Sequence, residues 1–223
     1  MKNLCLLLCL LPLFAIADED PFESVNRGMQ TVNDTADRLL IRPIAVGYDK
    51  NMPVPVRRLT SNFFGNLIDV GDGVNNLLQG KPKDAVNDVG RVLVNTTIGI
   101  GGLFDPATAM GIADHDEDFA QTLAVWGVPR GAYIVLPFFG PSTIRDLFGR
   151  SVDVTYDPLR HYYPVSHRNT LFAYSMINTR AAFLGADSVV FGDRYIFFRD
   201  AYLQRREFLE KDGMVEDPFG DDF

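Results

Sequence analysis

Three glycines lie close together in an uncharged segment, which is the first place where the sequence could bind a ligand. Gly99, Gly101 and Gly102 fall within NTTIGIGGLFDPA, residues 95–107. A dinucleotide-binding turn needs a third glycine where Phe104 stands, and a phosphate-binding loop needs a lysine that this segment lacks. The glycines instead allow the backbone to turn in apolar surroundings. The pattern favours either a tight turn between packed helices or a hinge at which elements approach closely.

Acidic residues alternate in DHDED, residues 114–118, as they do at the start of a calcium-binding loop. That loop requires a glycine where Phe119 stands and a glutamate where Val125 stands, so we expect an acidic turn in contact with solvent. The three histidines are scattered, and the serine-hydrolase pattern Gly-x-Ser-x-Gly does not occur. The sequence therefore predicts no metal site, no cofactor and no enzyme.

The apolar segment YIVLPFFGPSTI, residues 133–144, contains the strongest β-strand signal of the chain. Prolines at its centre and near its end exclude a plain helix, so we expect one short β-like hairpin. Leu136, Phe138 and Phe139 are too large for an ordinary exposed loop. They belong either to a core or to a surface that contacts hydrocarbon or an apolar partner.

The elements that must position these segments are helices, because apolar residues recur at three- and four-residue steps over most of the chain. The predicted helices cover residues 25–39 (ending before Pro43), 56–77, 82–93, 118–126, 142–148, 169–184 and 193–211. No internal repeat or change of composition marks a second domain. We therefore predict an all-α single domain of about seven amphipathic helices with one short β-like hairpin.

Polar side chains interrupt two of these helical stripes. Asn62 and Asn66 lie within one predicted helix, and Gln79 follows its end. They could line a path through the protein or satisfy the hydrogen bonds of helix ends, and the sequence does not decide between the two.

The ends of the chain carry signals of a different kind. Residues 1–17 combine a lysine, a short apolar run and a small-residue cleavage motif, which predicts a signal peptide that contains both cysteines of the sequence. We assign residues 18–213 to the folded domain and expect the acidic tail, residues 214–223, to be disordered. No later uncharged stretch is long enough for a membrane-spanning helix, and the net charge of −8 argues against nucleic acid as a partner.

Taken together, these segments resemble the MlaA (VacJ-like) family of outer-membrane proteins of Gram-negative bacteria. The matching segments are DPFESVNR (20–27), RPIAVGY (42–48), SNFFGNL (61–67), LLQGK (77–81), GRVLVNTTIGIGGLFDPA (90–107), DFAQTLAVWGV (118–128), YIVLPFFGPSTIRD (133–146) and AYLQRREF (201–208). Their order and spacing make the resemblance specific, and it extends over nearly all of residues 18–213.

The resemblance implies a ring of helices around a central channel, embedded in the inner leaflet of the outer membrane and bound to trimeric porins. Such a protein removes mislocalised phospholipids from the outer leaflet and passes them to a soluble periplasmic carrier, which maintains lipid asymmetry. The alternative is a structural porin-binding protein without a lipid channel. Family members are usually lipoproteins, and neither Cys5 nor Cys9 stands in a good lipid-attachment position.

The resemblance also suggests roles for the residues singled out above. It implies that Gly99, Gly101 and Gly102 lie near the channel mouth, so the glycines are candidates for a hinge or, with Asn62, Asn66 and Gln79, for a lipid path. Leu136, Phe138 and Phe139 are candidates for membrane or ring contacts. Arg145 and Asp146 are more easily interpreted as an ion pair that holds the hairpin than as a head-group site.

Overall fold

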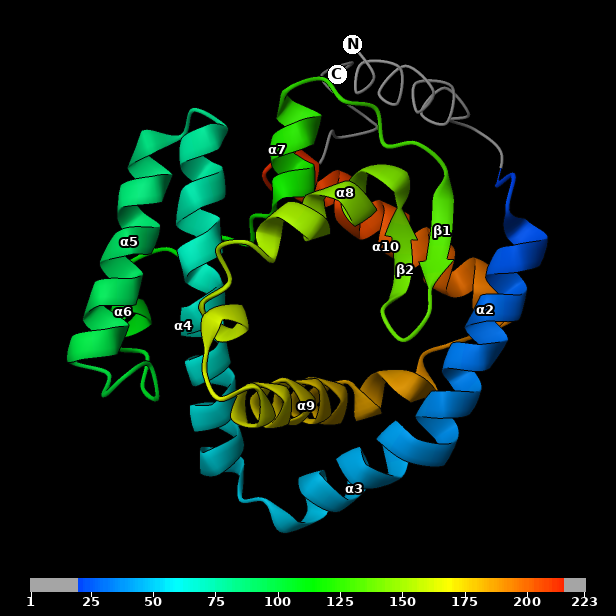
Figure 1. Cartoon of the computed structure of the whole chain (residues 1–223), viewed down its shortest axis with the longest axis horizontal. Coiled ribbons are helices and arrows are strands. Elements are labelled where there is room, and N and C mark those ends of the chain that lie inside the picture. The colour runs from blue at the N-terminus through cyan, green and yellow to red at the C-terminus, as the bar shows by residue number, and fades with distance from the viewer. Residues whose placement is uncertain (1–19, 215–223) are drawn as a thin grey trace, which may run out of the picture.

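Helices follow one another around an open ring in the computed structural model of the chain, which describes residues 20–214 (Figure 1). The helices are α2 (Glu23–Ala36), α3 (Arg42–Asn51), α4 (Val54–Leu78), α5 (Pro82–Thr97), α6 (Pro106–Ala109), α7 (Phe119–Val125), α8 (Ile144–Asp153), α9 (Val165–Ala182) and α10 (Arg194–Glu210). Strands β1 (Tyr133–Leu136) and β2 (Gly140–Thr143) form an antiparallel hairpin that hangs toward the opening. The predictions of an all-α ring and of one short hairpin are confirmed. The predicted signal peptide, residues 1–17, and nearly all of the predicted tail lie outside the described residues.

Local signals account for most helix boundaries. The side chain of Asp118 accepts a hydrogen bond from the N–H of Gln121 at the start of α7, and Thr143 caps α8 in the same way through the N–H of Asp146. Gly80, with a φ of 79°, ends α4.

Several predicted boundaries are wrong. The helix predicted from residue 142 begins at Ile144, because residues 142 and 143 belong to β2, and the helix predicted from residue 169 begins at Val165. The first helix does not stop before Pro43, because a π-helical turn, Asp37–Ile41, joins α2 directly to α3. Pro43 lies in the first turn of α3. A proline is tolerated there, because a helix does not need a hydrogen bond from the N–H groups of its first turn. The chain therefore bends here without leaving the helical path, and α2 and α3 form one curved side of the ring (Figure 1).

The last helix closes the ring. At one end of α10, the hydroxyl of Tyr195 donates a hydrogen bond to Asp20, just before α2. At the other end, Arg206 forms an ion pair with Asp118, the cap of α7. Because α10 thereby holds the first helix and the middle of the chain together, the opening does not depend on contacts between sequence neighbours alone.

The interior of the ring wall is polar. The largest fully buried side chains are Asn75, Asn76, Asp88, Thr122, Ser142 and Thr143. Within the described part of the chain the buried hydrophobic residues are mostly alanines, and a small cluster around Tyr133, Val135 and Tyr195 resembles an ordinary core. Soluble proteins place charged and amide side chains mainly at the surface, so this distribution is unusual.

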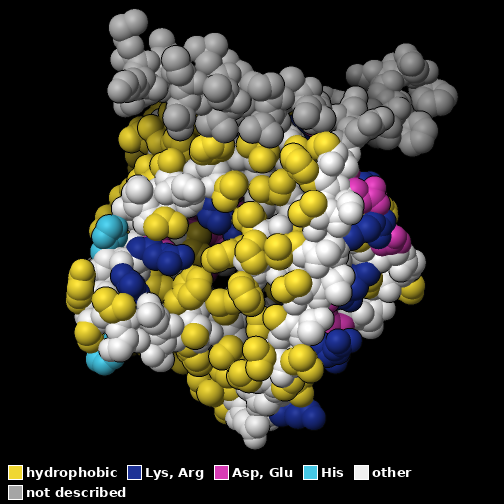
Figure 2. Space-filling view, turned by 45° about the vertical axis from the view of Figure 1, so that its right-hand side comes forward, with side chains coloured by type: hydrophobic (Ala, Val, Ile, Leu, Met, Phe, Trp, Pro, Cys, Tyr) yellow, Lys and Arg dark blue, Asp and Glu magenta, His cyan; other side chains and the backbone are white. Residues whose placement is uncertain are grey.

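The exterior of the ring, in contrast to the interior of its wall, is apolar. The stripe of α2 and the turn after it faces outward, with Val25 67% and Leu39 65% exposed, and Val86 of α5 is 73% exposed. Figure 2 shows hydrophobic side chains covering much of one face around an opening. An exposed apolar surface of this extent indicates contact with apolar surroundings. None of the helices within residues 20–214 has the length and hydropathy needed to cross a membrane.

Candidate functional site

Two adjoining cavities occupy the opening of the ring. The first, of about 720 Å³, lies between α2, the hairpin, α9 and α10, and the second, of about 460 Å³, lies between α4, the end of α8 and α9. Phe139, Ser175 and Met176 line both cavities. The tip of the hairpin and the middle of α9 therefore border the place where one cavity passes into the other. The space-filling view shows an opening among hydrophobic side chains on one face of the ring (Figure 2).

Two asparagines of α2 fix the hairpin in this position. The side chain of Asn26 donates to the carbonyl of Tyr133 and accepts the N–H of Val135, over 3.1 and 2.9 Å. Asn33 lies two turns later on the same face of α2 and repeats this pattern with the hairpin turn. The two side-chain amides thus satisfy the free edge of β1 as a third strand would.

The first cavity combines apolar side chains with neutralised charges. Its aromatic lining residues are Phe138, Phe139, Phe183, Phe197 and Phe198. Arg180 lies between Asp37 and Asp187, with both nitrogen–oxygen distances at 2.9 Å. Arg194 is held by Asp34 at 3.0 Å. An amphipathic molecule can place its hydrocarbon against the aromatic rings while polar atoms contact these ion pairs.

The second cavity is lined by acidic groups whose ionisation is disfavoured. Burial raises the pKa of the Asp72 carboxyl to about 9, although the N–H of Glu117 donates a hydrogen bond to it. Burial also raises the pKa values of Glu117 and Asp153. At neutral pH Asp72 therefore holds its proton, so this wall carries less negative charge than its composition suggests.

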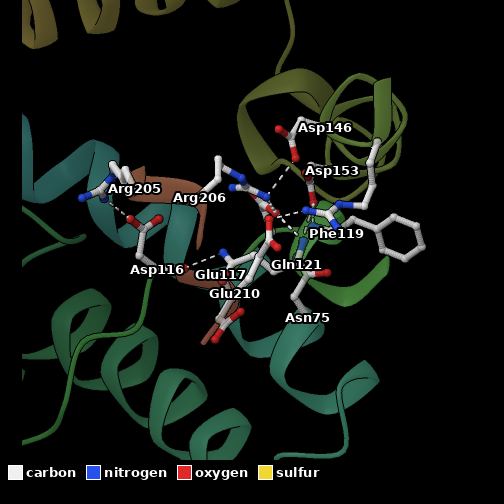
Figure 3. A network of polar contacts seen from close by, with 12 residues as sticks. Asn75, Asp116, Glu117, Phe119, Gln121, Asp146, Asp153, Arg205, Arg206 and Glu210 are labelled. Carbon is white, nitrogen blue, oxygen red and sulfur yellow. Dashed lines mark hydrogen bonds and ion pairs between the residues drawn. The ribbon is translucent and has the colours of Figure 1, made fainter. Parts of the chain in front are cut away.

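A buried ionic network lies next to the second cavity. Arg206 donates to Asp118 over 2.5 Å and lies 3.1 Å from Asp146, which also accepts a hydrogen bond from the hydroxyl of Tyr202 (Figure 3). The neighbouring Arg205 pairs with Asp116 on the exposed side.

The network refines one interpretation of the sequence and corrects another. Residues 114–118 form an acidic turn in which Asp114 and Asp116 are largely exposed, as expected, whereas the Glu117 side chain is buried, and all four carboxylates pair with basic residues from distant parts of the chain. Arg145 and Asp146 do not pair with each other. Arg145 pairs with Glu210, and Asp146 pairs with Arg206. Both partners belong to α10, which is distant in sequence, so proximity along the chain cannot reveal these pairs.

Comparisons with known proteins agree with this architecture. The family described as MlaA lipoprotein matches residues 18–209. The chain belongs to the MlaA lipoprotein family. It is 36% identical over 207 residues to the Escherichia coli K12 protein named "Intermembrane phospholipid transport system lipoprotein MlaA", covering 88% of this chain and 80% of that protein.

A second relative and a solved structure extend the comparison. The Haemophilus influenzae protein of the same name is 32% identical over 202 residues, covering 88% of this chain and 81% of its own. A solved structure described as "Structural basis for maintenance of bacterial outer membrane lipid asymmetry" superposes with a TM-score of 0.77 at 34% identity. It covers 86% of this chain and 99% of the solved chain. The ring is therefore the architecture of MlaA proteins.

The structure places the glycine segment of this MlaA chain at the turn after α5, packed against α4. A Cβ atom on Gly99 would lie 2.3 Å from the carbonyl oxygen of Asn95. Gly102 has a φ of 84°, and a Cβ there would lie 2.8 Å from the side chain of Asn66. The lining residues of the two cavities do not include Gly99, Gly101 or Gly102, and their role as a hinge stays a prediction.

The polar candidates of the MlaA chain act on neighbouring loops. Asn62 donates to the carbonyl of Leu103 and Asn66 to the hydroxyl of Thr96, both next to the glycine turn. Gln79 donates to Glu117 over 2.7 Å. These three side chains are also absent from the lining of the two cavities.

The hairpin candidates lie nearest to the opening. Phe138 and Phe139 line the first cavity, and Phe139 reaches the second as well. Leu136 precedes them, and its carbonyl is held by Asn33. No pattern in the sequence distinguishes Ser175, Met176 or Asn33, because their importance depends on what lies across the ring. The helical spacing of Asn26 and Asn33 was the one available signal.

Proposed function

We propose that this chain is the outer-membrane component of an intermembrane phospholipid transport system. In this proposal it removes mislocalised phospholipids from the outer leaflet and passes them to a soluble periplasmic carrier, which maintains lipid asymmetry. The names of its relatives and of the superposed structure support a role with phospholipid.

The observation that carries the proposal is the reversed distribution of polar and apolar residues. Exposed residues such as Val25, Leu39 and Val86 form an outer surface that hydrocarbon can solvate, while the buried residues are mainly polar. Helices satisfy their own backbone hydrogen bonds, so a ring of helices can lie within one leaflet without a spanning segment. We place the ring at the periplasmic face of the outer membrane on this basis.

The two cavities provide the route for the lipid. A polar head group resists entering hydrocarbon, whose thickness is about 30 Å in a typical bilayer. Charged and hydroxyl groups along the cavities can replace water around the head group, while Phe138, Phe139 and the other rings contact the acyl chains. Passage requires no chemical change of the lipid, and we propose transport without an enzymatic step.

The direction of flow depends on partners in this proposal. The sequence contains no phosphate-binding loop that would couple nucleotide hydrolysis to movement. A trimeric porin would hold the ring in the membrane, and a soluble periplasmic carrier would withdraw the lipid from its periplasmic end. The affinity of the carrier for the lipid then sets the direction.

Blocking the opening tests the proposal. Ser175 lies on α9 where the two cavities meet, so Ser175→Trp fills the connection. Ala173 is exposed on the same helix and lines neither cavity, so Ala173→Trp is the matched control. Cells that lack the protein should accumulate phospholipid in the outer leaflet. The wild type and Ala173→Trp should reverse this accumulation, whereas Ser175→Trp should not.

The same cells distinguish the alternative function. A structural porin-binding protein without a channel would keep outer-leaflet phospholipid low whether or not the opening is filled. If Ser175→Trp restores asymmetry as well as the wild type does, passage through the ring is excluded. Co-purification of porin with both variants verifies that the substitutions leave the assembly intact.

A further inference from the structure

Two arginines of the second cavity lack the close ion pairs that Arg180 and Arg194 of the first cavity make. Arg150, at the end of α8, has no carboxylate partner among residues 20–214, and its guanidinium lies 5.7 Å from the ring centre of Phe139. Arg160 lies 3.6 Å from Asp157 without a hydrogen bond between them, and its Nε is buried without a partner. Its guanidinium lies 4.8 Å from the ring centre of Phe172.

The arginines of the first cavity provide the contrast. Arg180 binds two carboxylates and Arg194 binds one, all within 3.0 Å. Their donors are therefore occupied by the protein itself. Arg150 and Arg160 instead present guanidinium donors to the same hollow space of about 460 Å³, and a guanidinium that no carboxylate contacts closely favours an anionic ligand.

The carboxylates around these two arginines have other partners. Asp116, Glu117 and Asp118 pair with Arg205, Lys81 and Arg206, respectively. Asp72 is protonated at neutral pH, and Asp153 accepts hydrogen bonds from the N–H of Phe119 and from the hydroxyl of Tyr156. Asp157 accepts the N–H of Leu159 and contacts Arg160 only at 3.6 Å, without a hydrogen bond. The acidic wall therefore does not compete strongly for the guanidinium groups.

We propose that Arg150 and Arg160 bind the phosphodiester group of a phospholipid as its head group occupies the second cavity. The inference rests on the proposed function, since it names the place in the route where the head group is held. Guanidinium groups match the geometry of phosphate oxygens and donate more than one hydrogen bond to them. Phe139 and Phe172 lie against the two guanidinium groups, so the rings hold the arginines in place and offer an apolar surface to the first carbons of the lipid.

Binding of short-chain lipid to the purified full chain in mild detergent tests this site. The probe is dihexanoylphosphatidylethanolamine, titrated calorimetrically into the wild type, Arg150→Gln, Arg160→Gln and the double variant. Each single substitution should weaken binding by a factor of about ten, because a hydrogen bond to a charged group is among the stronger ones in proteins. Arg150→Lys should fall between the wild type and Arg150→Gln, since it retains the charge but loses the planar fork.

Matched probes and a matched variant isolate the phosphate contact. Arg58→Gln removes an exposed arginine that lines neither cavity, and it should bind the lipid like the wild type. Dihexanoylglycerol, which lacks the phosphate, should bind the wild type and the double variant equally. Inorganic phosphate should bind far more weakly than the phospholipid. If it binds as tightly, the site is one for free phosphate and the proposal is overturned.

The outcomes separate this inference from the proposed function. If the wild type binds the phospholipid and the double variant binds it equally well, the arginine site is wrong while transport stands. If the wild type binds no phospholipid, the proposed function fails with it. Thermal unfolding verifies that each variant is folded. If Arg160→Gln unfolds, the lipid affinity of Arg150→Gln alone tests the arginine site. Arg150→Gln should stay folded, because the Arg150 side chain is exposed and forms no ion pair within the described chain.

Discussion

The side-chain oxygen of Asn33 accepts a hydrogen bond from the backbone N–H of Phe138 over 2.8 Å. The amide of the same side chain donates to the carbonyl of Leu136, also over 2.8 Å. One residue of α2 thus determines where the tip of the hairpin lies, and Phe139 at that tip borders both cavities. The width of the passage depends on a contact between segments that are 105 residues apart in sequence.

Removal of this contact should loosen the hairpin. Asn33→Ala leaves two backbone groups without their protein partner, which should cost about 1 kcal/mol of unfolding free energy where water can replace the lost partner. Amide hydrogen exchange at Phe138, whose N–H loses its acceptor, should become faster, and so should exchange at the neighbouring Phe139. Thr31→Ala is the control, because the Thr31 hydroxyl donates only to the carbonyl of Arg27 within α2. Unchanged exchange in Asn33→Ala would show that the hairpin is held by other contacts.

Two neighbouring arginines of α10 should differ strongly in their effect on stability. The side chain of Arg206 is 8% exposed and pairs with Asp118 and Asp146, whereas that of Arg205 is 65% exposed and pairs with Asp116. Arg206→Ala leaves two carboxylates without their cation and should cost about 3 to 5 kcal/mol. Arg205→Ala should cost less than about 1 kcal/mol. Denaturant unfolding in detergent measures both, and equal losses would contradict the network in Figure 3.

The buried carboxyl of Asp72 should make stability depend on pH. Its pKa is raised from 3.8 to about 9 in the folded chain, so the folded state keeps a proton that the unfolded state has lost throughout this range. The stabilisation that protonated Asp72 contributes is fully present below the pKa that this carboxyl has in the unfolded state. It declines as the pH rises toward the pKa of Asp72 in the folded state. Asp72→Asn should therefore lose less thermal stability than the wild type between about pH 6 and pH 9.

The Asp72→Asn variant changes the titration of this side chain with little change in its contacts. Asparagine retains an oxygen that can accept the N–H of Glu117, so the substitution changes the titration and keeps the hydrogen bond. Thr31→Ala, which changes no titratable group, should follow the pH profile of the wild type. Parallel pH profiles for the wild type and Asp72→Asn would mean that Asp72 ionises normally in the folded protein.

The apolar exterior should determine membrane retention. Val86 and Val89 of α5 are 73% and 54% exposed, and aspartate at both positions would place charges where we expect hydrocarbon. The Val86→Asp/Val89→Asp variant should shift from the membrane pellet into the supernatant after a high-salt wash. Asn87→Asp, at a half-buried polar position between them, should stay in the pellet. If the double variant stays there as firmly as the wild type, α5 does not contact the membrane.

The sequence by itself determined the helices, several of their caps and the hairpin, because these features depend on residues close together in the chain. The spacing of Val25, Val32 and Leu39 requires a single helical face, and Asp118 and Thr143 cap helices through neighbouring N–H groups. The resemblance to a known family added the ring, which local patterns alone do not specify.

Only the tertiary structure decided which way the helical faces point and which charges meet. Periodicity shows that Val25 and Leu39 share a face, but not that this face is turned outward, since a core and a membrane favour the same side chains. Arg206 meets Asp118 across 88 residues of sequence, whereas Arg150 has no carboxylate partner within residues 20–214. These pairings depend on the closure of the ring by α10, because the electrostatic environment of a side chain is set by neighbours in space and not by neighbours in sequence.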